Sequence, residues 1–229
     1  MADAAPVKWL IQVLCCRAMA PAESISLSPD LPLKYVGGDP SLDFVNTVDW
    51  TEAGLENDRL VDYARVIEWG SGAGVIDRPT ATRLLAAAEK RPQLARSAFE
   101  RARAARSVLE RLFASVATRK LSARAMDDFN RLLRDAGGHL RFAYAERDGA
   151  TWQPDRADDL DLVTWLVTRA AAKLLESDAS RLRVCAGPDC GWIYVDRSRN
   201  GLRRWCQMET CGTSAKSRRR AARTAALRA

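Results

Sequence analysis

The chain has 229 residues, of which 47% are hydrophobic and 28% charged, and its formal net charge is +7. This composition is ordinary for a soluble protein and excludes wholesale disorder, and the length is enough to bury a sizeable core in one large domain or two smaller ones. No run approaches the roughly 20 consecutive apolar residues that a membrane-spanning helix needs, so we expect no membrane partner.

Residues 1–30 are expected to form a flexible leader outside the fold. The segment VKWLIQVLCCRAMA combines one lysine, a short apolar run and a small-x-small ending. This pattern weakly resembles a secretory signal peptide, although Arg17 interrupts the apolar run. The alternative is a start assigned too far upstream, with translation from Met19. In either case Cys15 and Cys16 are expected to belong to the leader and not to a site.

The first expected helix lies in GGDPSLDFVNTVDW. Asp39 is a good N-cap, Pro40 suits the first helical position, and apolar residues at helical spacing continue to Val48. Asp43, Asn46 and Thr47 share the polar side of this helix. With Arg59 as a candidate partner they are either a small-molecule site or a buried hydrogen-bond network, and the network is favoured because most buried polar groups are structural.

Four amphipathic patterns predict further helices, in RLVDYARVIEWGSGAG, DRPTATRLLAAAEKRP, QLARSAFERARAARSVLERLFASVATRK and SARAMDDFNRLLRDAGG. Glycines at 70–74 are expected to end the first, Pro79 and Pro92 bound the second, and Gly137–Gly138 end the fourth. In the third, arginines alternate with glutamates, which indicates a solvated face.

Two alternating runs in HLRFAYAERDGATWQPD, separated by Asp148–Gly149, predict a β-hairpin. ADDLDLVTWLVTRAAAKLLES then predicts an amphipathic helix with acidic residues in its first turn, where the helix dipole favours them. Residues 35–178 are therefore expected to form a mainly α domain with one small hairpin.

Four cysteines gather in CAGPDCGWIYVDRSRNGLRRWCQMETC, as two C-x4-C pairs 15 residues apart: Cys185, Cys190, Cys206 and Cys211. Disulfides would need an oxidising compartment, for which the sequence offers little, and a redox pair is more often C-x-x-C. Four soft ligands brought in as two short-range pairs fit one structural Zn²⁺ with no open position. The distant His139 is expected to be a hairpin residue and not a ligand.

The remainder of residues 181–229 predicts a small treble-clef-like ββα module. WIYVD is expected to be a strand, Asn200–Gly201 a two-residue turn, and LRRWC the returning strand. A helix should follow, capped by Thr213 or Ser214. Zinc-binding free energy can supply the folding free energy that such a small core lacks.

The same segment carries the charge of the chain. It holds 12 lysines and arginines against 3 acidic residues, whereas the preceding 180 residues are close to neutral. Such asymmetry favours a polyanion partner, with nucleic acid the commonest, and the alternative is a solvated basic tail. The candidate DNA contacts are Arg203, Arg204, Lys216, Arg218, Arg219, Arg220 and Arg223. Trp192 and Trp205 could stack on bases, but the small module needs them as core.

LRVCAGPDCGWIYVDRSRNGLRRWCQMETCGTSAKSRRR resembles the CGNR zinc finger of bacterial regulators, with its C-x4-C, S-R-N and R-R-W-C-x4-C-G-N-R-x-K-x-R pattern. GGDPSLDFVNTVDW and LVDYARVIEWGSGAGVID resemble the ABATE domain that accompanies this finger. The resemblance implies a stress-induced transcription regulator whose finger binds DNA. The chain has Thr213-Ser214 where the motif has Asn-Arg, so one candidate DNA-contacting arginine is lost.

The leading hypothesis is thus a cytoplasmic, zinc-dependent, DNA-binding regulator whose helical body senses a small effector or forms a homodimer. The main alternative is a zinc-stabilised protein-interaction module, and RNA binding is a third. No P-loop, G-x-S-x-G or H-E-x-x-H motif is present, so we do not expect an enzyme.

Overall fold

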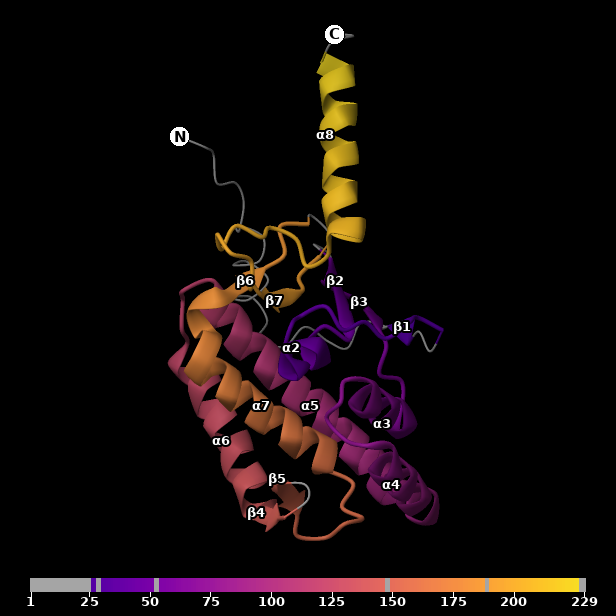
Figure 1. Ribbon diagram of the computed structural model, residues 1–229. Helices are drawn as coiled ribbons and strands as arrows, with labels where there is room; N and C mark the ends of the chain where they lie inside the picture. Colours follow the sequence, from indigo (N-terminus) through magenta and orange to yellow (C-terminus); the bar gives the residue numbers. More distant parts are fainter. Residues whose placement is uncertain (1–25, 28–29, 52–53, 147–148, 188–189, 227–229) are drawn as a thin grey trace.

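Helices dominate the computed structural model, which describes residues 26–27, 30–51, 54–146, 149–187 and 190–226. The predicted leader and its two cysteines therefore lie almost wholly outside the described residues. The long helix α5 (Pro92–Ala117) is central: it packs against α2 (Pro40–Val45), α3 (Tyr63–Gly72), α4 (Arg78–Lys90), α6 (Ala123–His139) and α7 (Leu162–Asp178). Figure 1 shows α5, α6 and α7 side by side. None of the described helices is both long and apolar enough to cross a membrane.

Local caps explain most helix starts. The side chains of Asp39, Asp62, Asp77 and Ser122 each accept a hydrogen bond from a backbone N–H in the first turn of the helix that follows. Each such cap satisfies one of the N–H groups that a helix start leaves unpaired. These are short-range signals, so the predicted starts of α2, α3, α4 and α6 are close to the observed ones.

The prediction that the first helix runs to Val48 is wrong. Helix α2 ends at Val45, and Val48 begins strand β2 (Val48–Thr51), which pairs antiparallel with β3 (Gly54–Asp58); β1 (Ser26–Leu27) runs parallel to β3. The Thr47 hydroxyl donates to the Phe44 carbonyl at 2.7 Å, and the Asn46 side chain bonds a distant strand. These bonds take Asn46 and Thr47 out of the helix.

The predicted hairpin is confirmed as β4 (Leu140–Ala145) paired with β5 (Gly149–Pro154), although Asp148 lies outside the described residues. Helix α6 does not stop at Gly137–Gly138 but continues to His139, whose ring stacks on Trp165 at 4.5 Å between centroids. Ala136 and Leu140 are buried on either side of the glycine pair, so packing holds the last turn in place.

Helix α3 also contains a glycine that was expected to end it. Gly70 lies inside α3 and faces α7, where an added Cβ would come within 3.2 Å of both Val163 methyl carbons. Gly70 therefore allows a close approach of two helices, and α3 ends only at Gly72.

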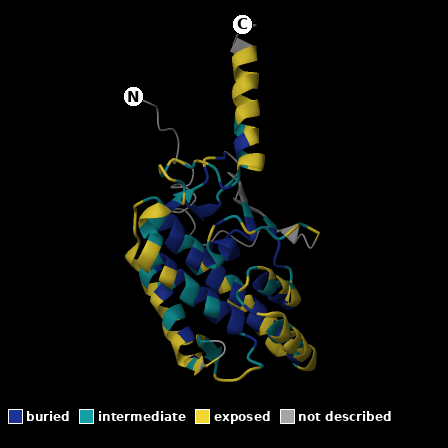
Figure 2. Cartoon of the chain, in the orientation of Figure 1, coloured by how far each residue is buried: buried dark blue, intermediate teal, exposed yellow. Residues whose placement is uncertain are grey.

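The apolar core does not stop at the end of α7. After the short 3-10 turn Ala179–Arg181, strands β6 (Leu182–Val184) and β7 (Ile193–Val195) form an antiparallel pair that packs on α5. Leu182, Ile193 and Val195 are at most 1% exposed and belong to the same buried cluster as the helices. Figure 2 shows this core as dark blue faces turned inward.

Candidate metal centre

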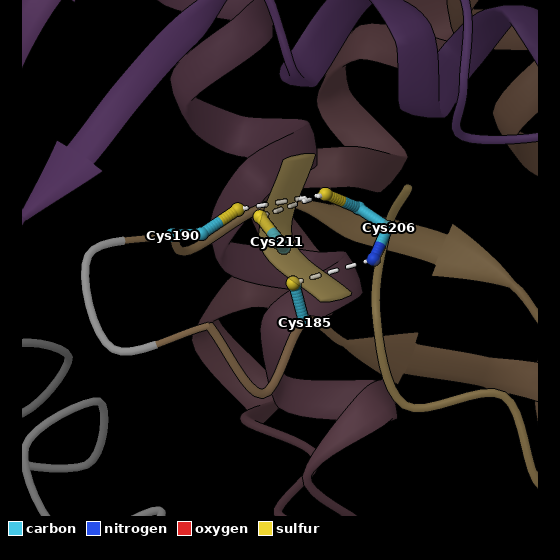
Figure 3. A group of neighbouring side chains, drawn as sticks. All are labelled: Cys185, Cys190, Cys206 and Cys211. Atoms are coloured by element: carbon cyan, nitrogen blue, oxygen red, sulfur yellow. Dashed lines mark hydrogen bonds between the residues drawn. The ribbon is translucent and has the colours of Figure 1, made fainter. Parts of the chain in front are cut away.

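The four predicted cysteines converge on one point, although they come from two loops and a helical turn (Figure 3). Their sulfur atoms all lie within 4.8 Å of one another. The Cys206 sulfur is 3.7 Å from that of Cys190 and 3.6 Å from that of Cys211. Zn–S bonds of about 2.3 Å at tetrahedral angles place sulfurs roughly 3.8 Å apart, so the cluster has the dimensions of a zinc site.

The backbone around the cluster suits thiolate ligands. Cys185 and Cys206 are nearly buried, and the Cys185 sulfur accepts hydrogen bonds from the N–H groups of Gly187 at 3.4 Å and Cys206 at 3.3 Å. A Cβ on Gly187 would lie 3.1 Å from the Cβ of Cys190 and 3.2 Å from the Cys211 sulfur. A larger residue at position 187 would therefore have to displace these ligand atoms by a few tenths of an ångström.

The ionisation of the four thiols requires a cation. Hydrogen bonds from neighbouring cysteines lower the pKa of Cys185 and Cys211, but they raise the pKa of Cys190 and Cys206. These opposed directions have one cause, which is that four negative charges repel one another in this small volume. A bound Zn²⁺ removes that conflict by binding all four as thiolates.

The local fold of the module differs from the sequence prediction in two ways. The turn at Asn200–Gly201 forms, with Gly201 at φ +63, but residues 202–205 do not return as a strand; β7 pairs instead with β6, which precedes the first cysteine. Thr213 is not a cap either, since its hydroxyl donates to the Met208 carbonyl within a continuous helical segment. The backbone of β7 pairs with β6 and not with the residues after the turn, and Thr213 lies inside a helical segment that has already begun at Met208.

That helical segment begins with the π-helical turn η2 (Met208–Gly212), which contains Cys211, and continues as α8 (Thr213–Ala226). Helix α8 contacts the fold through η2 and extends away from the rest of the molecule (Figure 1). From Thr213 to Thr224 every side chain except Ala215 is exposed. Lys216, Arg218, Arg219, Arg220 and Arg223 therefore lie on a helix whose base is bound to the metal centre.

The two arginines before Cys206 lie in different surroundings. Arg204 is exposed, with its guanidinium carbon 5.3 Å from the centre of the Trp205 ring. Arg203 is half-buried and donates to the carbonyls of Val36, Trp205 and Cys206. Trp192 is part of the buried core of the module, whereas Trp205 lines an open hollow of about 580 Å³ with Leu202, Met208 and others.

The predicted polar cluster lies where the helical body meets the zinc module. Asn46 acts like an additional strand residue: its amide nitrogen donates to the Ile193 carbonyl at 2.8 Å, and its amide oxygen accepts from the Ile193 N–H at 3.0 Å. Alongside, the Trp192 indole donates to the Val48 carbonyl and the Val195 N–H to the Gly37 carbonyl. Asn46 thus joins residues 147 positions apart in the sequence.

The other three members of the cluster are also buried and hydrogen-bonded. Asp43 accepts from the Gly37 N–H at 2.8 Å, and Thr47 accepts from Arg106. Arg59 makes a bidentate ion pair with Asp49 and lies 5.3 Å from the centre of the Trp192 ring. A ligand-binding role for these residues stays a prediction.

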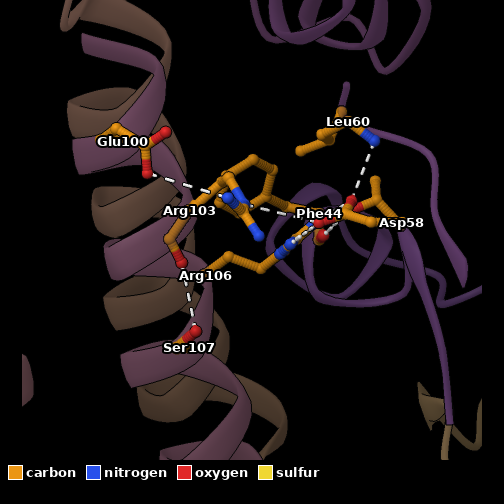
Figure 4. A network of polar contacts seen from close by, with 8 residues as sticks. Phe44, Asp58, Leu60, Glu100, Arg103, Arg106 and Ser107 are labelled. Atoms are coloured by element: carbon orange, nitrogen blue, oxygen red, sulfur yellow. Dashed lines mark hydrogen bonds and ion pairs between the residues drawn. The ribbon is translucent and has the colours of Figure 1, made fainter. Parts of the chain in front are cut away.

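Arg106 is a buried neighbour of this cluster that the sequence pattern did not single out. The arginines of α5 were expected to lie on a solvated face, but Arg106 is 4% exposed and pairs through both terminal nitrogens with Asp58, which is fully buried (Figure 4). Arg103 approaches the same carboxylate at 3.5 Å. Helical periodicity indicates this burial, because Arg106 falls four residues after Ala102 and three before Leu109, on the apolar face of α5.

Comparison with known protein families finds two matches. Residues 181–224 match the CGNR zinc finger, and residues 38–178 match ABATE, described as "Putative stress-induced transcription regulator". A search of curated proteins finds no match to the chain. The first match covers the four gathered sulfurs, which form one Zn²⁺ site. The second covers more than half of the chain, which therefore belongs to the ABATE family of transcription regulators and carries a CGNR zinc finger.

Proposed function

We propose that the protein regulates transcription by binding DNA through α8, which the zinc site holds in place. The observation that carries the proposal is α8 itself, an exposed basic helix that directly continues the π-helical turn η2, which contains the ligand Cys211. Zinc would supply structural support and no chemistry at DNA, because four cysteine ligands leave it no open position.

The basic residues of α8 are spaced to contact one partner. Lys216, Arg219, Arg220 and Arg223 repeat every three or four residues, so they follow one face of the helix. The 14 residues of α8 span about 21 Å, and a major groove about 12 Å wide admits a helix whose side chains are exposed, as those from Lys216 to Thr224 are. These four residues, with Arg218 and Arg204, are the proposed phosphate contacts.

The proposal also divides the chain into a helical body, residues 35–178, and a distinct finger, residues 181–229. The body would sense a small effector or form a homodimer. The protein would act in the cytoplasm and have no enzymatic activity, and the family description supports a regulator. An effector bound at Asp43, Asn46, Thr47 or Arg59 would act directly on the finger, because Asn46 bonds β7 and Arg59 lies against Trp192.

The test is binding of the zinc-loaded protein to random duplex DNA, by fluorescence polarisation at several salt concentrations. The variant changes Lys216, Arg219, Arg220 and Arg223 to Gln. Each phosphate contact contributes about 0.9 to the slope of log affinity against log salt, so the variant should lose up to about 3.6 of that slope.

A matched control removes four positive charges from the exposed surface of the body, by changing Arg96, Lys120, Arg124 and Arg134 to Gln. It should bind DNA almost as the parent does. Equal losses in both variants would indicate a diffuse effect of net charge, and absence of salt-dependent binding in the parent protein would refute the proposal.

The second candidate is a protein-interaction module. It is favoured by the hollow at the base of α8, where Leu202 is 75% and Met208 52% exposed beside Trp205. Loss of partner binding in a Leu202→Ser, Met208→Ser variant that still retains zinc, together with no DNA binding in the parent, would support this function.

A further inference from the structure

We infer that Arg203 is a positioning residue for the zinc ligand Cys206, and that its neighbour Arg204 is the arginine of this pair that is available to a partner. The two residues are adjacent and carry the same charge, so the sequence does not separate them. Their surroundings in the fold do.

The Arg203 guanidinium lies at the point where the Cys206 loop meets the body. Its Nε donates to the Trp205 carbonyl at 2.9 Å, and its Nη2 donates both to the Cys206 carbonyl and, at 3.3 Å, to that of Val36. One planar group thus holds the carbonyl of the ligand residue, the carbonyl before it, and the body segment that precedes α2. Lysine carries no such fork of donors.

Arg203 is itself held from two sides. Its guanidinium carbon lies 4.3 Å from the centre of the Tyr194 ring, and Tyr194 is fully buried in the same cluster as Cys185 and Cys206. The Tyr194 hydroxyl donates to the Arg203 carbonyl at 2.6 Å, while the Arg203 N–H donates to the Asp196 carboxylate at 3.0 Å. An arginine constrained in this way has little freedom to reach DNA.

Position and charge both favour a role at the metal site. Four thiolates outweigh one Zn²⁺, so the loaded site carries a net negative charge, and a nearby guanidinium offsets it. Residues that orient metal ligands from the outer shell typically change metal affinity by 10- to 100-fold when they are removed.

The experiment compares Arg203→Gln, Arg203→Lys and Arg204→Gln in the full-length, zinc-loaded protein. The first readout is the rate of zinc release to a chromogenic chelator in excess. We expect about a tenfold or greater increase for Arg203→Gln, a similar increase for Arg203→Lys because the fork is lost, and less than a twofold change for Arg204→Gln. Wild-type release rates in both Arg203 variants would overturn the inference, and a wild-type rate for Arg203→Lys alone would assign the effect to charge.

The second readout is the visible absorption of the cobalt-substituted proteins, which responds to ligand orientation and not to overall stability. It should change in the Arg203 variants and be unchanged in Arg204→Gln. If the Arg203 variants do not fold in excess zinc, Tyr194→Phe offers a milder test, since it removes only the bond to the Arg203 carbonyl. We expect a few-fold faster zinc release from Tyr194→Phe, and an unchanged rate would count against the inference.

DNA binding in saturating zinc separates this inference from the proposed function. Arg203→Gln should then bind DNA as the parent does. Weaker DNA binding by this variant with normal zinc retention would make Arg203 a DNA contact instead. If the parent does not bind DNA, the zinc and cobalt readouts still decide the role of Arg203.

Discussion

Two arginines on α5 show how burial changes the contribution of an ion pair to stability. Arg101 makes a bidentate pair with Asp161 and is about half exposed, whereas Arg106 makes a bidentate pair with Asp58 in the interior. An ion pair at the surface contributes little to stability, because water solvates both charges when they are apart. When one residue of an interior pair is replaced, the charge of the other stays buried without a partner, which costs about 3–5 kcal/mol.

We therefore expect Arg106→Gln to lower the free energy of unfolding by about 3–5 kcal/mol, and Arg101→Gln by about 1 kcal/mol or less. Urea denaturation in excess zinc measures both on the same helix. Similar losses of unfolding free energy in the two variants would mean that burial does not increase the contribution of the Arg106–Asp58 pair.

The raised pKa of Asp43 makes the stability of the protein depend on pH. Burial raises its pKa to about 6, and the hydrogen bond from the Gly37 N–H opposes this only in part. A carboxyl whose pKa is raised in the folded state favours folding when protonated, so its contribution is full below its unfolded pKa and is lost as pH rises through about 6.

Asp43→Asn removes this titration while an amide oxygen remains to accept from Gly37. Between pH 5 and 8 the variant should gain about 1.4 kcal/mol of unfolding free energy relative to the wild type. Chemical denaturation across that range gives the difference, and Asp127→Asn, at an exposed position of α6, should show almost no such trend.

At the scale of elements, the end of α2 decides how the finger is attached. Asn46 satisfies both backbone groups of Ile193, on the edge of β7 that faces away from β6. The predicted helical spacing from Leu42 to Val48 was compatible with a longer helix, but a helix through Asn46 would not satisfy β7. A tertiary bond therefore overrides local propensity.

Asn46→Ala should leave two buried backbone groups unpaired and cost about 2–4 kcal/mol. Because β7 leads into the Cys206 loop, zinc release should accelerate as well. Thermal unfolding and zinc release are the measurements, and Asn130→Ala on the exposed side of α6 is the control. Normal zinc retention by a destabilised Asn46→Ala protein would contradict this link between the two parts.

For the whole molecule, the shared core implies that zinc stabilises more than the finger. Leu182, Ile193 and Val195 complete the apolar cluster formed by α5 and its neighbours. Loss of the metal should loosen β6 and β7 and expose that cluster to water.

Removal of zinc by EDTA is thus expected to lower the temperature at which the helices of the body melt, followed by circular dichroism, by several degrees or more. A ligand present at 1,000 times its dissociation constant contributes about 4 kcal/mol to stability. EDTA already saturated with zinc is the control. Helices that melt at the same temperature with and without zinc would mean that the finger is an independent unit.

The sequence by itself determined the features whose signals are local. Two C-x4-C pairs predicted the metal site, the Asp39 cap and apolar periods predicted the helices of the body, and the charge count predicted a basic segment. Such signals extend over a few turns of helix or one short loop, so they do not depend on how the rest of the chain packs.

Tertiary structure decided which side chains became buried partners. It bonded Asn46 to Ile193, buried Arg106 against Asp58, paired β7 with β6 and turned Arg203 toward Cys206. The identity of an arginine or asparagine is compatible with solvent, a ligand or the interior. Only the approach of distant segments sets the local dielectric and the available partners, and those determine which of the three environments has the lowest free energy.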